Sequence, residues 1–181
     1  MMMDYPPKQL SMRLVNDQQI SLGEPAVPEG YCLRQFKPGD EIEWARLLVL
    51  GGFKDLDSHK IREYMKNLER LKGSAVIENN GRIVAVTFAT PIESSPPVGA
   101  LDFVVTHPSH RNLGLGRAVC SAVANFFINS DYQSVYLTTD DWRLPAIRIY
   151  LALGFKPEFT RDDMKCRWKT VMKNLTESRI D

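Results

Sequence analysis

The chain has 181 residues, of which 44% are hydrophobic and 25% are charged. This length suits one domain with its own core, and these fractions exclude a disordered or fibrous protein. Lysine and arginine total 23 and aspartate and glutamate total 22, which leaves a net charge of +1. Such a balance gives no electrostatic reason to expect general binding to nucleic acid or to a membrane surface.

Cysteine usage and the lack of targeting segments point to the cytoplasm. The three cysteines, Cys32, Cys120 and Cys166, fit neither a disulfide framework nor a zinc-binding spacing, so a reduced compartment is expected. Cys120 lies beside an apolar helix face without a histidine partner, which favours a packed thiol over a nucleophile. No apolar stretch approaches the roughly 18 residues of a membrane span, and residues 1–10 lack the apolar region of a signal peptide.

Residues 1–30 predict an extended N-terminal arm. They are rich in proline and lack a sustained hydrophobic period, so one edge strand near residues 12–15 is the regular element expected there. The main domain is expected to cover residues 31–175, followed by a short tail at 176–181.

A strand and two helices are expected after the arm. Residues 31–36 alternate as a strand does, and Asp40 has the position of a helix N-cap, with Glu43 three residues later completing a capping box. A second, single helix is expected from Ser58, because apolar residues recur at helical spacing until Gly73 ends it.

The middle of the chain predicts a β-hairpin and a buried strand. Residues 74–78 and 82–89 are rich in β-forming side chains and are joined by Asn-Asn-Gly, which is a strong hairpin signal. A proline-rich loop follows at residues 93–99. Residues 101–106 are then expected to form a buried strand that ends before Pro108.

Helices and strands alternate in the remainder. We expect a helix with a continuous apolar face from Leu115, a strand at 134–139, a helix with Pro145 in its first turn, and a last strand at 164–168. The order β-α-α-β-β-β-α-β-α-β predicts a mixed, mostly antiparallel sheet with helices packed on it. The expected fold class is therefore a single-domain, three-layer α/β/α fold.

The turn before the long helix carries the clearest chemical signal. In residues 105–117, VTHPSHRNLGLGR, a strand ends and Gly114 and Gly116 lead into the helix beside Arg111 and Arg117. Glycine permits backbone conformations that a Cβ would block, and free amides at a helix start can hold phosphate oxygens. The segment therefore predicts an anion-binding turn.

Three interpretations of this turn stay open from the residues alone. The first is a glycine-rich connection with no ligand. The second is a dinucleotide-binding turn, since Asp140 and Asp141 end the next strand, where an acidic ribose ligand would lie. Two observations oppose it: Val119 occupies the position of the third glycine of the dinucleotide motif, and no further βαβ units follow. The third is the pyrophosphate loop of an acyl-CoA enzyme.

Two motifs carry a family resemblance. The block V-x-H-P-x-x-R-x-x-G-x-G at residues 105–116 resembles the coenzyme A signature of the GNAT superfamily of N-acetyltransferases. Downstream, Ala146-x-x-x-Tyr150-x-x-x-Gly154-Phe155 is similar to the next motif of that superfamily. The hairpin and the two helices upstream also match its usual order, so the resemblance covers roughly residues 31–170.

The resemblance implies an N-acetyltransferase that uses acetyl-CoA as acyl donor and a primary amine as acceptor, by direct transfer in a ternary complex. It implies that the strand end binds the pantetheine arm through its backbone and that the loop amides hold the pyrophosphate. Arg143 stands where many members have a cofactor-contacting asparagine. The implied cofactor-binding residues are Val104, Val105, Thr106, Arg111, Asn112, Leu113, Gly114, Leu115, Gly116, Arg117 and Arg143.

Tyr150 and Asp102 are the predicted catalytic residues. The resemblance implies that Tyr150 protonates or hydrogen-bonds the departing thiolate, whereas periodicity alone would place it in the core. Asp102 is the candidate general base, because a carboxylate in an apolar strand is costly to bury; its alternative is a strand-end residue paired with an arginine or lysine. Lying two residues before Val104, Asp102 is expected to share a face with it.

Other titratable residues near the motifs have simpler interpretations. Glu93 is expected in a solvated loop, and at least one of Asp140 and Asp141 is expected to cap the next helix. His107 and His110 are expected to be loop histidines, because no third metal ligand accompanies them.

The acceptor stays open from the sequence, among small amines, polyamines, amino acids, antibiotics and protein termini. A homodimer is an expectation from family analogy. The alternative function is a non-catalytic acyl-CoA-binding module, a sensor or interaction domain on the same fold. Replacing Tyr150 by phenylalanine would distinguish the two. An enzyme should lose turnover and keep its affinity for the coenzyme.

Overall fold

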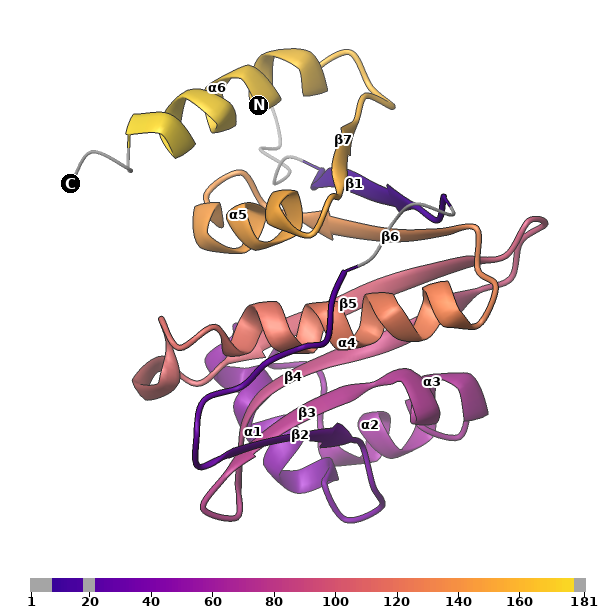
Figure 1. Ribbon diagram of the computed structural model, residues 1–181, viewed down its shortest axis with the longest axis vertical. Helices are drawn as coiled ribbons and strands as arrows, with labels where there is room; N and C mark the ends of the chain where they lie inside the picture. The colour runs from indigo at the N-terminus through magenta and orange to yellow at the C-terminus, as the bar shows by residue number, and fades with distance from the viewer. Residues whose placement is uncertain (1–7, 18–21, 178–181) are drawn as a thin grey trace, which may run out of the picture.

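One mixed β-sheet forms the middle layer of the computed structural model, which describes residues 8–17 and 22–177 (Figure 1). The strands are β1 Leu10–Val15, β2 Tyr31–Gln35, β3 Ala75–Asn79, β4 Arg82–Ile92, β5 Val98–Thr106, β6 Ser134–Thr139 and β7 Lys156–Glu158. The helices are α1 Glu41–Leu50, α2 Ser58–Tyr64, α3 Leu68–Gly73, α4 Leu115–Asn129, α5 Leu144–Ala152 and α6 Met164–Glu177, with a 3₁₀ turn at Pro108–His110.

The strands lie in the order β2-β3-β4-β5-β6-β1-β7. Every neighbouring pair is antiparallel except β5 and β6, which are parallel and are connected by α4 as a parallel pair requires. With one parallel pair among the described strands, the sheet is not the doubly wound sheet of a dinucleotide-binding domain.

Helices cover both faces of the sheet and bury two hydrophobic clusters. On one face α4, α5 and α6 pack on the sheet around Phe127, Tyr150 and Trp168. On the other face α1 and α2 pack around Trp44 and Phe88. In Figure 1, α4 crosses in front of β4 and β5, whereas α1 lies behind the sheet. The predicted three-layer, single-domain α/β fold with a mixed sheet is confirmed.

Local signals placed most of the predicted elements correctly. The strand at residues 134–139 and the helix that starts at Leu115 are β6 and α4, with the predicted starting residues. The hairpin turn between β3 and β4 has Asn80 and Gly81 at φ 49° and 75°. Both values are left-handed, as a two-residue hairpin of this kind needs, which explains the Asn-Gly pair.

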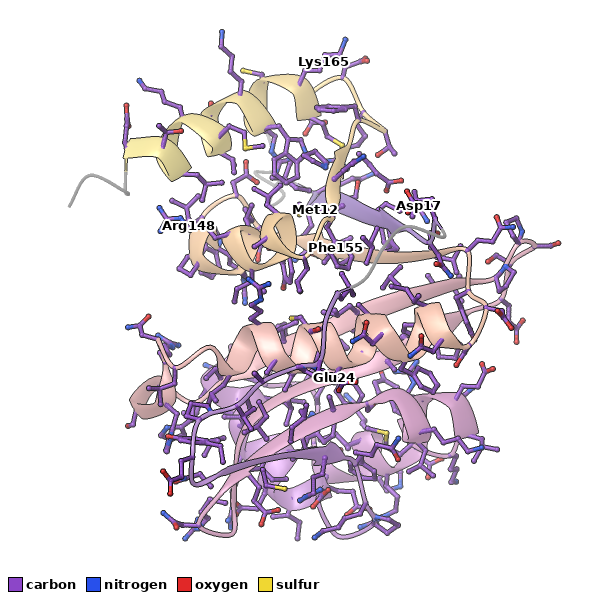
Figure 2. The ribbon with its side chains drawn as sticks, in the orientation of Figure 1. Met12, Asp17, Glu24, Arg148, Phe155 and Lys165 are labelled. Atoms are coloured by element: carbon purple, nitrogen blue, oxygen red, sulfur yellow. The ribbon has the colours of Figure 1, made fainter. Side chains whose placement is uncertain are left out.

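The predicted N-terminal strand exists but does not lie at the edge of the sheet. β1 begins at Leu10 and pairs antiparallel with both β6 and β7. Its alternate side chains Leu10, Met12 and Leu14 are buried in the core, and Figure 2 shows Met12 close to Phe155 of the same cluster. Residues 1–7 and 18–21 of the predicted arm, and 178–181 of the predicted tail, lie outside the described residues.

The predicted last strand is wrong, because residues 164–168 begin helix α6. Met164, Trp168, Val171 and Leu175 are buried, a spacing of four, three and four that places them on one helical face. Alternation of Met164, Cys166 and Trp168 suggested a strand, yet Cys166 is exposed. Figure 2 shows Lys165 of α6 pointing outward. No helix in the described ranges combines the length and apolarity needed to cross a membrane.

The single helix expected from Ser58 to Gly73 is two helices, α2 and α3. Asn67 interrupts it, because its side-chain oxygen accepts a hydrogen bond from the backbone N–H of Arg70 at 2.9 Å and caps α3. The capping box at Asp40 and Glu43 is also absent. Asp40 is the N-cap residue of α1, as predicted, but its side chain makes no capping hydrogen bond. Its carboxylate instead accepts hydrogen bonds from the guanidinium of Arg34, at 2.7 and 2.9 Å, and from the backbone N–H of Lys37.

Candidate active site

A cavity of about 190 Å³ lies where β5 and β6 separate. The two strands pair only at Val98–Ala100 of β5 with residues 134–136 of β6. Beyond Ala100, the side of β5 that faces β6 is unpaired and its backbone groups are free to bind a ligand. The residues that line the cavity are Gln9, Phe53, Leu101, Asp102, Phe103, Val104, Thr138, Thr139, Arg143, Ala146 and Tyr150.

A β-bulge shapes the wall of this cavity. Phe88 of β4 pairs with Asp102, and Val86 pairs with Val105, so β5 contains one residue more than its partner over this stretch. Phe103 has a left-handed backbone with φ 53°. The expectation that Asp102 and Val104 share a face is therefore wrong: Asp102 lies on the face of Phe88, and Val104 packs against the opposite cluster.

Tyr150 on α5 is both a core residue and a cavity residue. It is 5% exposed, packs in the core cluster and lines the cavity. Burial raises the pKa of Tyr150, so its hydroxyl keeps its proton at neutral pH. The hydroxyl makes no hydrogen bond with another residue of the described part of the chain. Its proton is therefore available to a group bound in the cavity.

Asp102 supplies a carboxylate to the same cavity. Its side chain forms neither a hydrogen bond nor a salt bridge with any residue in the described ranges, and its backbone carbonyl accepts a hydrogen bond from the Thr87 hydroxyl at 2.8 Å. The alternative that Asp102 is a strand-end residue paired with an arginine or lysine therefore does not hold. An unpaired carboxylate and a buried tyrosine hydroxyl that line the same cavity give it one proton acceptor and one proton donor.

Arg143 lines the cavity at the end of β6. Its Nε donates to Asp140 at 3.0 Å, and its guanidinium lies over the rings of Phe53 and Trp142, 5.5 and 4.6 Å from their centres. Gln9, which sequence reasoning missed, donates to Asp140 at 3.2 Å. No motif could have indicated Gln9, because it reaches the site only through the pairing of β1 with β6.

Neither Asp140 nor Asp141 caps α5, which corrects the sequence-based expectation. The N-cap residue is Arg143, which makes no side-chain cap hydrogen bond. Both carboxylates instead bind arginines: Asp140 pairs with Arg143, and Asp141 pairs with Arg167 of α6. The Arg167 guanidinium hydrogen-bonded to Asp141 holds the pKa of that carboxyl below its usual value.

The predicted anion-binding turn has the geometry that such a site needs. Asn112 and Gly114 have φ 62° and 77°, and Gly114 is the N-cap residue of α4. The first amide of this region to be hydrogen-bonded is that of Ala118, to the carbonyl of Gly114. Within the described part of the chain, the backbone N–H groups of residues 112–117 have no acceptor.

The side chains of the turn leave its amides accessible. A Cβ at Gly114 would meet no heavy atom within 4 Å, so the glycine serves conformation and access rather than packing. Arg111 and Arg117 are exposed and add positive charge to the positive end of the α4 dipole. Leu115 is buried, so it can contribute only its backbone. Gly116 packs against Ile149 and Thr106, where a Cβ would lie 3.3–3.4 Å from their side-chain atoms.

The remaining candidates lie outside the cavity lining. His110 forms a 2.8 Å hydrogen bond with the Tyr31 hydroxyl, and His107 accepts one from the backbone of Ser109, in the loop expected for them. Glu93 is exposed in its loop. Cys120 is fully buried, and burial raises the pKa of its thiol. Among the described residues no group of three or more metal-ligating side chains is gathered.

Comparison with known proteins identifies the class. A family model described as the acetyltransferase (GNAT) family matches residues 40–155, which is more than half of the chain. The chain therefore belongs to the GNAT family of acetyltransferases, as its two motifs implied. The bulged strand, the glycine-led turn and all cavity-lining residues except Gln9 lie within the matched residues.

Particular relatives and structures are similar over much of the chain. A mycothiol acetyltransferase from Thermomonospora curvata is 29% identical over 146 residues, which cover 76% of this chain and 48% of the relative. A GCN5-related N-acetyltransferase structure from Sphaerobacter thermophilus aligns with a TM-score of 0.66 at 21% identity, over 82% of this chain and 48% of that chain. An aminoglycoside N-acetyltransferase solved in complex with CoA aligns with a TM-score of 0.60 at 21% identity, over 72% and 92%.

These matches differ in how much of each protein they cover. The chain spans about half the length of the curated relatives it matches. The two structural alignments show the fold alone, because both are below 25% identity.

Proposed function

We propose that this protein is an N-acetyltransferase that transfers an acetyl group from acetyl-CoA to a primary amine by direct transfer in a ternary complex. The proposal rests on three features that follow one another along β5 and the α4 connection to β6. A row of free amides begins α4, the unpaired side of β5 leads away from it, and a cavity with Tyr150 and Asp102 lies where β5 and β6 separate.

The residues present fit the donor's chemical parts. The free N–H groups of residues 112–117 would hold the pyrophosphate, with Arg111 and Arg117 adding charge. The backbone of Val104–Thr106 would bind the pantetheine arm as an added strand would. None of the loop residues 111–117 lines the cavity with Arg143. Arg143 would therefore act at the acyl end of the donor, away from its phosphates.

Acetyl-CoA supplies the activated acetyl group as a thioester when bound. A lysine-like amine has a pKa near 10.4 and is almost wholly protonated at neutral pH, so it needs a base. Asp102 first takes one proton from the ammonium and passes it to solvent, which frees the nitrogen lone pair. Asp102 then takes the second proton, which the nitrogen loses as it bonds to the acetyl carbon. Tyr150 gives its proton to the sulfur as the carbon–sulfur bond breaks, and both residues return to their starting states by exchange with solvent. Each transfer contributes about 10²–10⁴-fold to the rate.

Calorimetric titration with acetyl-CoA and, separately, with NAD tests the donor site. Micromolar binding of acetyl-CoA that weakens when Arg111 is replaced by alanine would support the phosphate turn. A screen of primary amines for acetyl-CoA consumption then tests the transfer. Binding of acetyl-CoA without acetylation of any amine would favour the non-catalytic module, and binding of neither nucleotide would remove the proposal altogether.

A further inference from the structure

Arg70 on α3 carries a half-buried charge with no partner. Its guanidinium carbon lies 5.0 Å from the ring centre of Tyr64 and 6.0 Å from that of Phe88. The side chain makes no hydrogen bond or salt bridge with any residue in the described ranges. Burial lowers the pKa of Arg70, which remains charged at neutral pH. A guanidinium that lies over aromatic rings and has no counter-ion is positioned to bind an anion that arrives with a ligand.

Asp102 carries the complementary unpaired charge. It pairs with Phe88 across β4 and β5, so it lies on the same face as the ring beneath Arg70. The carboxylate and the guanidinium attract each other, yet they form no salt bridge. Asp102 lines the cavity, and Arg70 lies beyond its lining. The two charges are therefore near each other without direct contact.

An aromatic surface continues from these charges into the cavity. The ring centres of Phe88 and Phe103 are 5.6 Å apart, and those of Phe103 and Phe53 are 5.0 Å apart. Phe53 and Phe103 both line the cavity and are half-buried, so part of each ring is open to a ligand. An apolar group that entered the cavity beside Asp102 would pack on these rings.

Arg143 does not offer the same binding group as Arg70. Although it lines the cavity, its Nε is already hydrogen-bonded to Asp140 at 3.0 Å, and that carboxylate balances its charge. A second anion at Arg143 would compete with Asp140. Of these two arginines near Asp102 and the aromatic surface, Arg70 is the one whose charge is unbalanced.

We infer that the acceptor is an amino acid with an apolar side chain, whose carboxylate is bound by Arg70 and whose amino group is bound by Asp102. This inference rests on the proposed acetyl transfer to an amine and names the chemical class of that amine. The apolar side chain packs against Phe53 and Phe103. A charge-assisted, two-point contact of a guanidinium with a carboxylate is strong and directional, so amines that lack the carboxylate are discriminated against.

Two matched pairs of amines test the inference on the full chain. L-phenylalanine differs from 2-phenylethylamine, and L-leucine from 3-methylbutylamine, by the carboxylate alone. The ratio of kcat/KM within each pair is measured by thiol release from acetyl-CoA. We expect the amino acid of at least one pair to be preferred by about tenfold or more, and Arg70→Met to reduce that preference by about tenfold.

Arg62→Met is the matched control, because Arg62 lies on the neighbouring helix α2 and pairs with Glu41 at 3.5 Å. It is expected to retain the preference. Thermal unfolding and acetyl-CoA affinity of Arg70→Met are measured alongside, to show that the variant is folded and that its donor site is intact. A wild-type protein that uses both members of each pair equally, or an Arg70→Met variant that keeps the preference, would overturn the inference and leave acetyl transfer standing.

Direct binding separates failure of the inference from failure of the proposed function. Each amine is titrated calorimetrically into the protein with CoA present. Binding of an amino acid, but not of its matched amine, that is lost in Arg70→Met supports the recognition site even if no acetylation occurs. If neither amino acid binds and neither is acetylated, the inference is overturned, while acetyl-CoA affinity still tests the donor site by itself.

Discussion

Asp102 and Val104 are two residues apart in β5, yet their side chains face opposite sides of the sheet. The left-handed Phe103 between them adds a residue to β5 and shifts its pairing with β4. As a result Asp102 lies on the face of Phe88, near the charge of Arg70, while Val104 packs against the other cluster. The bulge therefore places a carboxylate in the lining of the cavity where β5 and β6 separate.

Replacing Asp102 by asparagine tests its role as proton acceptor. We expect kcat/KM at neutral pH to fall by about 10²–10⁴-fold. The deficit should shrink as pH rises, because an amine with a pKa near 10.4 loses its proton to water without help. The measurement is a pH–rate profile for both proteins. Glu93→Gln is the control, since Glu93 is an exposed loop carboxylate, and its profile should match the wild type. A pH-independent deficit in Asp102→Asn would contradict the base role.

Tyr150→Phe removes the hydroxyl that would protonate the leaving sulfur. The ring keeps its place in the core, so we expect kcat to fall by about 10²-fold or more while acetyl-CoA affinity changes little. Stopped assays of thiol release and calorimetry measure the two quantities. Tyr132→Phe is the control: Tyr132 is also buried, and its hydroxyl donates to Glu69 at 2.7 Å outside the cavity lining. That variant should lose stability but keep its turnover. Equal turnover in Tyr150→Phe and wild type would exclude Tyr150 as the proton donor.

Gly114→Ala tests whether the turn at α4 holds phosphate. The substitution forces an L side chain into a backbone with φ 77°, and the strain should distort the free amides. We expect acetyl-CoA affinity to fall by about tenfold or more, measured by calorimetry. Gly81→Ala is closely matched, with φ 75° and open space around its Cβ in the hairpin turn. It should cost similar stability and leave affinity unchanged. A parallel loss of affinity in both variants would show that the effect is global.

The sequence predicted the parts of the site that lie on local motifs. The turn at residues 112–117 and Tyr150 on its helix are where the two motifs placed them. Sequence reasoning missed the features that depend on distant pairing. Gln9 reaches the cavity because β1 inserts between β6 and β7, and Phe53 reaches it from the loop after α1. The bulge at Phe103 has no local signal either, because a phenylalanine with positive φ is not what its residue type favours.

Asp141→Asn tests the contact between the end of β6 and α6. The hydrogen bonds from Arg167 lower the pKa of Asp141 in the folded protein. Its contribution to stability is therefore complete above the unfolded-state pKa of about 3.9 and is lost as pH falls through the lower folded pKa. The side chain is 38% exposed, so we expect Asp141→Asn to reduce the free energy of unfolding at pH 7 by about 1 kcal/mol or less.

The difference between Asp141→Asn and wild type should disappear as the pH falls below the folded pKa, in urea unfolding curves recorded across this range. Asp162→Asn is the control, because Asp162 is exposed between Arg161 and Asp163 and forms no hydrogen bond or salt bridge with the rest of the described chain. It should match the wild type at every pH. A deficit in Asp141→Asn that persists unchanged below that pKa would mean that the lost ionic contact is not its cause.

Trp168→Ala tests whether residues 164–177 pack as helix α6 rather than as the strand that alternation suggested. Trp168 is 2% exposed and lies in the core with Val171, three residues further along the helix. Removing its ring should lower the free energy of unfolding by about 3–5 kcal/mol, measured in urea. Lys169→Ala changes the next residue, which is exposed, and should stay within about 0.5 kcal/mol of the wild type. In a strand reading Cys166 would share the buried face with Trp168, so Cys166→Ser should also destabilise the protein. The helix places Cys166 in solvent and predicts no such loss.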